Sequence, residues 1–466
     1  MDSADALIAL QDALGPRGFM PAAQVEDRYL VDIKGTRGAV PLAVLRPAST
    51  AEVSRALAIC HAANIPVVTQ GGRTGLVQSH LPQAGEIALS TERMHAIESI
   101  DTDAAMAVVQ SGVVLQALQD RLDAAGLMFP LDLGARGSCT VGGNISTNAG
   151  GNRVIRYGMT RELVVGLEAV LADGTVLDGL RPLIKNNTGI DLKHLFIGSE
   201  GVLGIVTRAV LRLLPKPAER TVALCALREF DSVRALLRQA RARLGGELTA
   251  FEVMWDSYFS RAARVVPKAP PLAPGQPFYV LVEASSGDAG GAAGLERLLH
   301  AALEDATLSD AVIAKSGAEN EALWKLRDLS VEVSRSIGPV VAFDVSLPIA
   351  QMQAFVGQMQ QAVRAIDPRC ADNVVYGHLG DGNLHISVHQ PPQRPETGHM
   401  IEEAVYGLVG VVRGSISAEH GIGVSKREFL PHSRSPQEIA AMHALKNALD
   451  PKHLLNRGRI LEHRSA

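Results

Sequence analysis

Two segments in the C-terminal half carry histidines and a carboxylate in a pattern that suits a metal site. The first reads Y-G-H-L-G-D-G-N-L-H at residues 376–385, and the second reads S-A-E-H-G-I-G at residues 417–423. Three glycines and an aspartate between His378 and His385 disfavour a helix, and the odd spacing would put the two histidines on opposite faces of a straight strand. A turn or bulge at 380–382 would bring both imidazoles to one point. With Glu419 as third ligand and one position open, they would form a catalytic Zn²⁺-type site, although histidines hydrogen-bonded in a core would have the same spacing.

The N-terminal half contains three glycine-rich segments, at residues 67–75, 130–151 and 198–206. In the first, an apolar run enters a glycine turn, which either lets backbone N–H groups converge on a phosphate or serves only as a structural turn. The second mixes glycines with small polar residues, which is unfavourable inside a strand and suits a backbone wrapped around an extended polar ligand. No G-x-G-x-x-G follows a strand, so a Rossmann dinucleotide site is not indicated.

Together these segments resemble the FAD-binding domain of the vanillyl-alcohol oxidase flavoprotein superfamily, and residues 131–217 are most similar to its FAD-dependent D-lactate and D-2-hydroxyglutarate dehydrogenases. The resemblance extends from about residue 40 to Arg459. It implies an α+β fold, with a vanillyl-alcohol-oxidase-type (PCMH-like) FAD-binding domain, an α+β cap domain built on an antiparallel sheet, and a C-terminal helical segment. It also implies that FAD is bound without a covalent bond, because covalent members carry a histidine where this chain has Arg73.

The resemblance assigns residues to the cofactor position by position. The residues assigned to the FAD pyrophosphate are Gln70, Gly71, Gly72, Arg73, Thr74 and Gly75. The residues assigned to the flavin and its chain are Asp132, Ser138, Gly142, Gly143, Asn144, Thr147 and Asn148. Ile205 and Val206 are assigned to the adenine side, and Asn456 returns to the flavin. The chain departs from its relatives at 77–80, where V-Q-S-H stands in place of a valine and two glycines.

The same resemblance assigns the catalytic residues. His378, His385 and Glu419 match the family's ligands for a divalent metal, Zn²⁺ or Mn²⁺, and His420 matches its catalytic histidine. A metal bound to the hydroxyl of a 2-hydroxy acid lowers its pKa, and a neutral histidine can then take the proton while hydride passes to the flavin. Arg327 matches the arginine that binds the substrate carboxylate, for which a guanidinium offers bidentate geometry.

Three positions distinguish the expected substrate. Hydroxyglutarate dehydrogenases carry threonine, lysine and asparagine where this chain has Val331, Ala342 and Ser387. We expect Val331 one helical turn after Arg327, on the same face of a helix. A second carboxylate next to these smaller or apolar groups would be desolvated without a partner, which is costly. We therefore expect a D-2-hydroxy monocarboxylate such as D-lactate, a longer aliphatic homologue or D-mandelate, with D-2-hydroxyglutarate as the alternative. Lys315, Lys325 or Arg335 could supply a replacement cation for that alternative.

The chain pattern predicts the elements that position these residues. Strands are expected at 87–90, 105–110, 164–171 and 175–177, the last two joined by a hairpin at Ala172-Asp173-Gly174. After a break at Pro215-Lys216-Pro217, strands at 221–227, 248–253, 278–283 and 340–345 alternate with helices, one of them capped by Asp231. We expect an FAD-binding domain at 1–217, a cap domain carrying the metal ligands at 218–425, and a helical segment at 426–466.

The composition excludes several classes of protein. A formal charge of −4 on 466 residues gives no reason to expect nucleic acid or an anionic membrane as partner. Cys60, Cys139, Cys225 and Cys370 form no C-x-x-C pair, which argues against a zinc ribbon or an iron–sulfur module. No apolar run approaches the ~20 residues that span a bilayer, and the acidic first residues are unlike a secretory or transit signal. We expect a cytoplasmic protein, and a homodimer is allowed.

Alternatives of other kinds remain open. A metal-dependent hydrolase would use the same ligands and need no flavin. A transferase of the ether-lipid synthase type would need a histidine-rich stretch in the cap, which this sequence lacks. An oxidase would pass its electrons to oxygen, whereas a dehydrogenase would pass them to electron-transfer flavoprotein, a quinone or a cytochrome.

Overall fold

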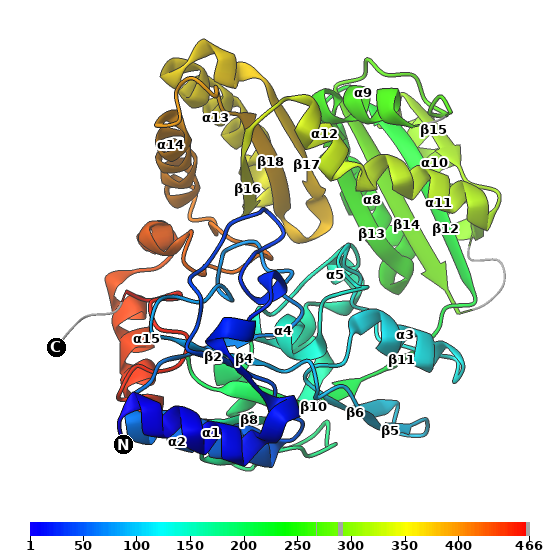
Figure 1. The fold of residues 1–466 in the computed structure, drawn as a ribbon. Coiled ribbons are helices and arrows are strands. Elements are labelled where there is room, and N and C mark those ends of the chain that lie inside the picture. The colour runs from blue at the N-terminus through cyan, green and yellow to red at the C-terminus, as the bar shows by residue number, and fades with distance from the viewer. Residues whose placement is uncertain (267, 288–291, 463–466) are drawn as a thin grey trace. The chain divides into compact units, whose positions relative to one another are not determined.

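The computed structural model describes residues 1–266, 268–287 and 292–462 (Figure 1). The chain forms two compact units. Unit 1 contains residues 1–151, 158–216 and the chain from Glu419 onward, and unit 2 contains residues 152–157 and 217–418. The boundaries expected from the sequence lay after residues 217 and 425. In the described part of the chain, no helix is both long enough and apolar enough to cross a membrane.

Unit 1 begins with a small sheet in the strand order β1-β2-β4-β3, in which β2 and β3 both run parallel to β4. Two helices pack against it through a shared apolar core. Ser49 caps α2 through the Glu52 N–H, and Asn64 ends α2 in the left-handed conformation. The bounds are β1 Phe19–Pro21, β2 Ala43–Leu45, β3 Val67–Gln70, β4 Ile87–Ser90, α1 Ser3–Gly18 and α2 Thr50–Ala63.

A second, antiparallel sheet of unit 1 has the strand order β5-β6-β10-β8-β9. Its β8–β9 pair confirms the hairpin expected around Ala172-Asp173-Gly174, with Gly174 at φ 91°. The strands are β5 Ile97–Asp101, β6 Met106–Gln110, β8 Val164–Val170, β9 Val176–Gly179 and β10 Ile205–Arg212. A separate pair joins β7 Leu127–Met128 to β11 Leu214–Pro215. The helices are α3 Leu115–Asp123, α4 Val141–Ser146, α6 Thr160–Leu163 and α7 Lys193–Phe196.

The C-terminal segment of unit 1 is less helical than expected. It contains a 3-10 helix, Arg427–His432, and α15, Pro436–Leu449. A capping box between Ser435 and Glu438 starts α15. The helix stops before Asp450 because Pro451 disfavours a helical conformation at the residue before it, and residues 450–462 then run without regular helix.

Unit 2 is built on a seven-stranded antiparallel sheet in the order β15-β12-β14-β13-β17-β18-β16. The central strands β12, β13 and β14 are buried almost throughout because helices cover both faces. The strands are β12 Glu219–Leu227, β13 Leu248–Trp255, β14 Phe278–Ser286, β15 Asp310–Ile313, β16 Val340–Ser346, β17 Asn373–His378 and β18 Asn383–His389.

One face of this sheet packs against α9, α11 and α12 through a core that includes Tyr258, Trp324 and Tyr376. Helices α8 and α10 pack together beside β12, and α13 and α14 pack together beside β16. Glu229 precedes α8, so Asp231 lies in its first turn and is not the expected cap. The helices are α5 Val154–Tyr157, α8 Phe230–Leu244, α9 Asp256–Val265, α10 Ala292–Glu304, α11 Gly317–Asp328, α12 Ser330–Ser336, α13 Met352–Ile366 and α14 Thr397–Val411.

Candidate active site

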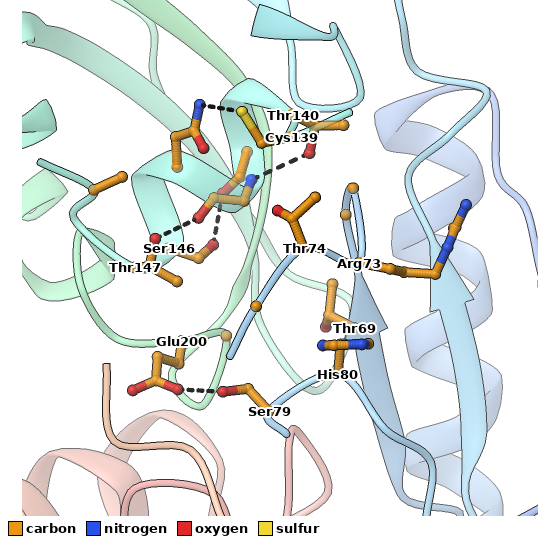
Figure 2. Close-up of a pocket in the computed structure, with 18 of the residues that line it drawn as sticks. Thr69, Arg73, Thr74, Ser79, His80, Cys139, Thr140, Ser146, Thr147 and Glu200 are labelled. Carbon is orange, nitrogen blue, oxygen red and sulfur yellow. Dashed lines mark hydrogen bonds between the residues drawn. The ribbon is translucent and has the colours of Figure 1, made fainter. Parts of the chain in front are cut away.

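Unit 1 contains a cavity of roughly 320 Å³ between the loop after β3, the start of α4 and the loop before β10 (Figure 2). Most of the residues assigned to FAD from the sequence line it. They are Gly71, Gly72, Arg73, Thr74, Gly75, Gly142, Gly143, Asn144, Thr147, Ile205, Val206 and Asn456. The cavity therefore gathers all three glycine-rich segments and the C-terminal return of the chain.

The two main loops approach so closely that a side chain would not fit between them. A Cβ added at Gly72 would lie 2.2 Å from the carbonyl oxygen of Ser138. Glycine at this position lets the β3 loop pass against the loop before α4, and this contact forms one wall of the cavity.

Buried polar atoms in the wall suit a polar ligand. Thr69 Oγ1, Ser111 Oγ and His80 Nε2 have no hydrogen-bond partner within the described part of the chain, and all three residues line the cavity. Buried polar atoms are usually hydrogen-bonded, so these three fit a ligand rich in hydroxyl, phosphate and amide groups, such as FAD. Burial lowers the pKa of His80 to about 4, so its ring is neutral at pH 7.

Arg73 lines the cavity, but its side chain points away from the loop at 140–147 (Figure 2). The guanidinium lies over the Tyr29 ring, 5.1 Å from its centroid, and Nη1 lies 3.5 Å from a Glu92 carboxylate oxygen. This side chain is therefore held by neighbours outside the cavity.

Four residues assigned to FAD from the sequence are not among the described residues that line the cavity: Gln70, Asp132, Ser138 and Asn148. Gln70 is fully buried and donates to the carbonyls of Tyr29 and His80, both at 2.9 Å. Asn148 accepts a hydrogen bond from the Arg161 N–H at 2.9 Å. The side chains of Gln70 and Asn148 thus hold neighbouring loops in place.

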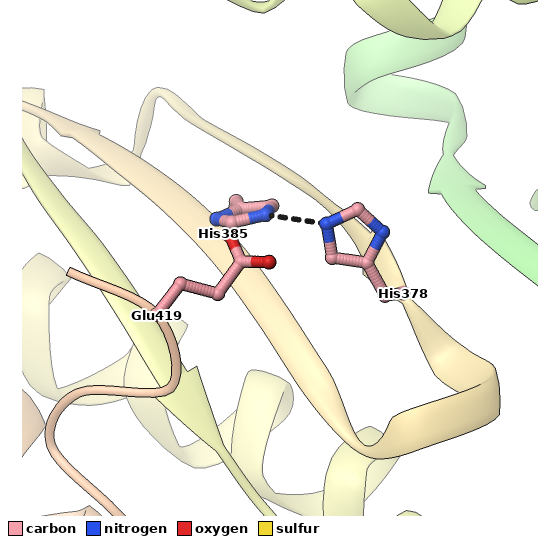
Figure 3. A group of neighbouring side chains, drawn as sticks. All are labelled: His378, His385 and Glu419. Atoms are coloured by element: carbon pink, nitrogen blue, oxygen red, sulfur yellow. Dashed lines mark hydrogen bonds between the residues drawn. The ribbon is translucent and has the colours of Figure 1, made fainter. Parts of the chain in front are cut away.

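In unit 2, His378 ends β17 and His385 lies on β18 (Figure 3). A 3-10 turn at Leu379–Asp381, followed by Gly382 at φ 89°, makes the two strands a hairpin. Tyr376 pairs with His385, and His378 lies two residues beyond Tyr376, so both histidines share one face of the sheet. Their Nε2 atoms lie 3.3 Å apart. Two ligands of a tetrahedral Zn²⁺ would be separated by about this distance, given Zn–N bonds of about 2.0–2.1 Å.

Carboxylates on the neighbouring strands lie behind both imidazoles. Glu252 pairs with His378 across β13 and β17, and Asp344 pairs with His385 across β16 and β18. His378 Nδ1 donates to Glu252 at 2.8 Å, so its Nε2 is the nitrogen that faces His385. His385 Nδ1 lies 3.7 Å from Asp344. Such carboxylate partners are typical of metal-binding histidines.

Glu419 and His420 directly follow Ala418, whose N–H donates to the Asp344 carbonyl on β16 at 3.2 Å. In unit 2, ligand atoms of His378 and His385 lie within 4.8 Å of one another, whereas Glu419 belongs to unit 1. Glu419 and His420 also line the cavity of unit 1. The donor set of two imidazoles and one carboxylate fits a divalent metal.

Arg327, near the end of α11, is buried and contacts two neighbouring side chains. Its Nε donates to Glu252 at 2.7 Å, and its Nη2 lies 3.3 Å from His378 Nε2. Burial would raise the pKa of Glu252, but its contacts with His378 and Arg327 hold it below its usual range. Glu252 therefore remains ionised and ties the arginine to the first histidine.

The three residues assigned to substrate choice lie in different surroundings. Ala342 and Ser387 pair across β16 and β18, Ala342 exposed and Ser387 buried with its Oγ 2.9 Å from Ser334 Oγ. Val331 is 53% exposed. It was expected one helical turn after Arg327 on the same face, and this is wrong, because Leu329 separates α11 from α12 with ψ 24°.

Comparisons with known proteins agree with this geometry. The FAD binding domain family matches residues 41–179, and the C-terminal domain of FAD linked oxidases matches residues 216–460. Mitochondrial D-2-hydroxyglutarate dehydrogenase of Bos taurus is 40% identical over 97% of this chain and 83% of its own. D-2-hydroxyglutarate dehydrogenase of Xanthomonas citri pv. viticola is 39% identical over 91% of this chain and 89% of its own.

Among solved structures, p-cresol methylhydroxylase with substrate bound is similar, with a TM-score of 0.76 at 16% identity. The likeness covers 98% of this chain and 96% of the other. It confirms the expected fold class, a PCMH-like FAD-binding domain with an α+β cap domain.

Proposed function

The chain belongs to the family of FAD-dependent D-2-hydroxy-acid dehydrogenases, which includes the D-2-hydroxyglutarate dehydrogenases, and we propose that it oxidises a D-2-hydroxy monocarboxylate to the 2-keto acid with a bound divalent metal. The observation that carries this proposal is the set of groups on one face of the unit 2 sheet. Two facing imidazoles and a buried arginine lie there, whereas Ala342 and Ser387 offer no charge to a second carboxylate.

We infer that FAD is bound without a covalent bond in the cavity of unit 1. The glycine-lined walls and the buried polar atoms of Thr69, His80 and Ser111 would hold it. When bound, FAD supplies an acceptor for hydride. Arg73 stands where a covalent attachment would need a histidine, and its side chain faces Tyr29 and Glu92. Acid precipitation should therefore release the yellow colour, and colour retained in the pellet would contradict non-covalent binding.

His378, His385 and Glu419 would hold the metal, Zn²⁺ or Mn²⁺. When bound, the metal supplies a Lewis acid that lowers the pKa of a coordinated hydroxyl. The carboxylates behind the histidines support this role, because each leaves an Nε2 atom directed toward the other. Arg327 would hold the substrate carboxylate through its two Nη nitrogens, since Glu252 occupies its Nε.

His420 would take the proton of the substrate hydroxyl. It adjoins Glu419 in the sequence, and both residues line the cavity that would contain the flavin. A base at this place can remove the hydroxyl proton while hydride leaves the neighbouring carbon. The electrons then leave for an external acceptor such as electron-transfer flavoprotein, a quinone or a cytochrome.

D-2-hydroxyglutarate is the second candidate substrate, favoured by the names of the bovine and Xanthomonas relatives. Arg335 is a candidate for the cation that would bind its distal carboxylate. It lies on α12 one turn after Val331 and is exposed, and the same helix reaches Ser387 through Ser334. Lys325 instead lines a separate apolar cavity with Pro270 and Pro271.

Steady-state kcat/KM for D-lactate, D-2-hydroxybutyrate, D-mandelate and D-2-hydroxyglutarate tests the substrate. We expect a preference for the monocarboxylates, and Arg335→Ala should leave their kcat/KM within about twofold. A clear preference for D-2-hydroxyglutarate that Arg335→Ala abolishes would establish the second candidate and refute the first.

A further inference from the structure

Glu200 is a buried carboxylate that lines the unit 1 cavity beside Glu419 and His420. It lies in the turn before β10, and its backbone is fixed on both sides. Its N–H donates to the Ser146 carbonyl at 2.7 Å, and its own carbonyl accepts from Asn456 Nδ2 at 2.5 Å. The backbone of Glu200 is therefore anchored to α4 and to the C-terminal return of the chain.

The carboxylate of Glu200 accepts hydrogen bonds from the loop that carries the candidate base. The N–H of Ile422 donates to it at 2.7 Å, the N–H of Gly423 at 3.0 Å, and the Ser79 hydroxyl donates from the opposite loop. Burial raises the pKa of Glu200, while these donors and the nearby Lys426 act against it. A buried carboxylate that accepts several hydrogen bonds is held in one position.

The loop approaches this carboxylate too closely for any larger residue. A Cβ added at Gly421 would lie 2.7 Å from Glu200 Oε1, and Gly421 has a φ of 84°. The next residues continue the contact, because the Val424 N–H donates to the Val77 carbonyl at 2.9 Å. Residues 421–424 are thus fastened to the 77–79 loop and to Glu200 together.

We propose that Glu200 and Ser79 fix the loop at residues 421–424 and thereby position Glu419 and His420 at the flavin cavity. We call the hydrogen bonds that Glu200 makes with Ser79 and with this loop the latch. Glu200 acts as a positioning residue, because its oxygens are committed to backbone and hydroxyl donors. His420 lies one residue before Gly421 and two before Ile422, so loss of the latch would let both the ligand and the base move. This inference rests on the roles proposed for Glu419 and His420.

Glu200→Gln tests the latch with little change of shape. An amide keeps one accepting oxygen but places an N–H₂ group against a donor, so one donor of the loop loses its partner. Hydrogen exchange of the 419–425 backbone should become faster, metal affinity should fall, and anaerobic flavin reduction should slow by about 10- to 100-fold. KM should change by less than about threefold, because Arg327 lies on another element.

Ser79→Ala should show the same changes to a smaller degree, about 3- to 10-fold in flavin reduction, and should add little to Glu200→Gln. If Glu200→Gln does not fold, Ser79→Ala alone tests the latch. Glu168→Gln is the matched control, since Glu168 is a buried carboxylate of β8 that bonds Thr50 and Thr207. It should leave exchange at 419–425 unchanged.

Unchanged exchange at 419–425 in both Glu200→Gln and Ser79→Ala would overturn the latch. His420→Ala separates this outcome from failure of the proposed function. If His420→Ala reduces its flavin at the normal rate, the proposed base is wrong, yet hydrogen exchange still reports whether Glu200 holds the loop.

Discussion

Glu252 joins two residues of unit 2 that we propose bind substrate and metal, Arg327 and His378. Its carboxylate accepts from Arg327 Nε at 2.7 Å and from His378 Nδ1 at 2.8 Å. The first contact orients the guanidinium, and the second keeps the imidazole in the tautomer whose Nε2 can bind a metal. One buried carboxylate thus sets the orientation of two proposed functional groups.

Glu252→Gln should weaken metal binding by about 10- to 100-fold, as loss of a carboxylate behind a metal-binding histidine typically does. The measurement is titration of the metal-free protein with Zn²⁺ or Mn²⁺. Glu283→Gln is a matched control, because Glu283 is a fully buried carboxylate of β14 that bonds Arg153 and Trp324. Equal metal affinity in wild type and Glu252→Gln would refute this role.

His80 predicts a pH dependence of stability. Its pKa is lowered to about 4 when folded, mainly by burial, against about 6.5 unfolded. Below the unfolded value only the unfolded chain takes up the proton, so stability is lost as the pH falls from 6.5 toward 4. Between pH 7.5 and pH 5 this loss amounts to about 2 kcal/mol.

His80→Gln should remove that part of the loss, measured by urea unfolding of the FAD-free protein at both pH values. The exposed His95 offers the control, and His95→Gln should keep the wild-type pH dependence. An unchanged pH dependence in His80→Gln would show that the buried ring is not the group responsible.

The β17–β18 hairpin brings His378 and His385 together despite their unfavourable spacing in the sequence. A separation of seven would split two histidines on a straight strand, but the turn at Leu379–Asp381 returns the chain so that both share a face. Glycines and an aspartate at the turn make this arrangement predictable from the sequence. The pairings of the two histidines with Glu252 and Asp344 were not predictable from the sequence, because β13 and β16 are distant from the hairpin in the sequence.

Metal binding should therefore stabilise this hairpin. Free metal at 100 times its dissociation constant stabilises a folded protein by about 2.7 kcal/mol, so thermal unfolding should shift upward on adding Zn²⁺ and downward with chelator. His385→Ala should abolish the shift, while His389→Ala, on the same strand, should keep it. A metal-induced shift that survives His385→Ala would place the ion elsewhere.

The break between α11 and α12 was not expected from the sequence. The residues from Trp324 to Val331 include no glycine or proline that would signal the break at Leu329, so Val331 was expected beside Arg327. Glu252, the lone charge within the apolar run L-T-A-F-E-V-M-W of β13, could have indicated a site residue from the sequence. A charge in such a run is buried only with partners, and here the partners are Arg327 and His378.

Across the whole molecule, each unit supplies one part of the proposed chemistry. Unit 1 contains the cavity that fits FAD, and unit 2 contains the imidazoles and the arginine that fit a metal-bound 2-hydroxy acid. Family membership and fold were predictable because glycine-rich loops and histidine spacing are local in the sequence. The substrate was less predictable from the sequence, because recognition of its distal group depends on how α12 packs near β18.

Anaerobic addition of substrate to the purified yellow protein tests the central proposal most directly. D-lactate or D-2-hydroxybutyrate should bleach the visible flavin absorbance within one turnover, while the L-enantiomers should leave it unchanged. Chelator should block the bleaching without releasing the flavin. A colourless protein, or a flavin that no D-2-hydroxy acid reduces in the presence of metal, would contradict the assignment of a flavin-dependent D-2-hydroxy-acid dehydrogenase.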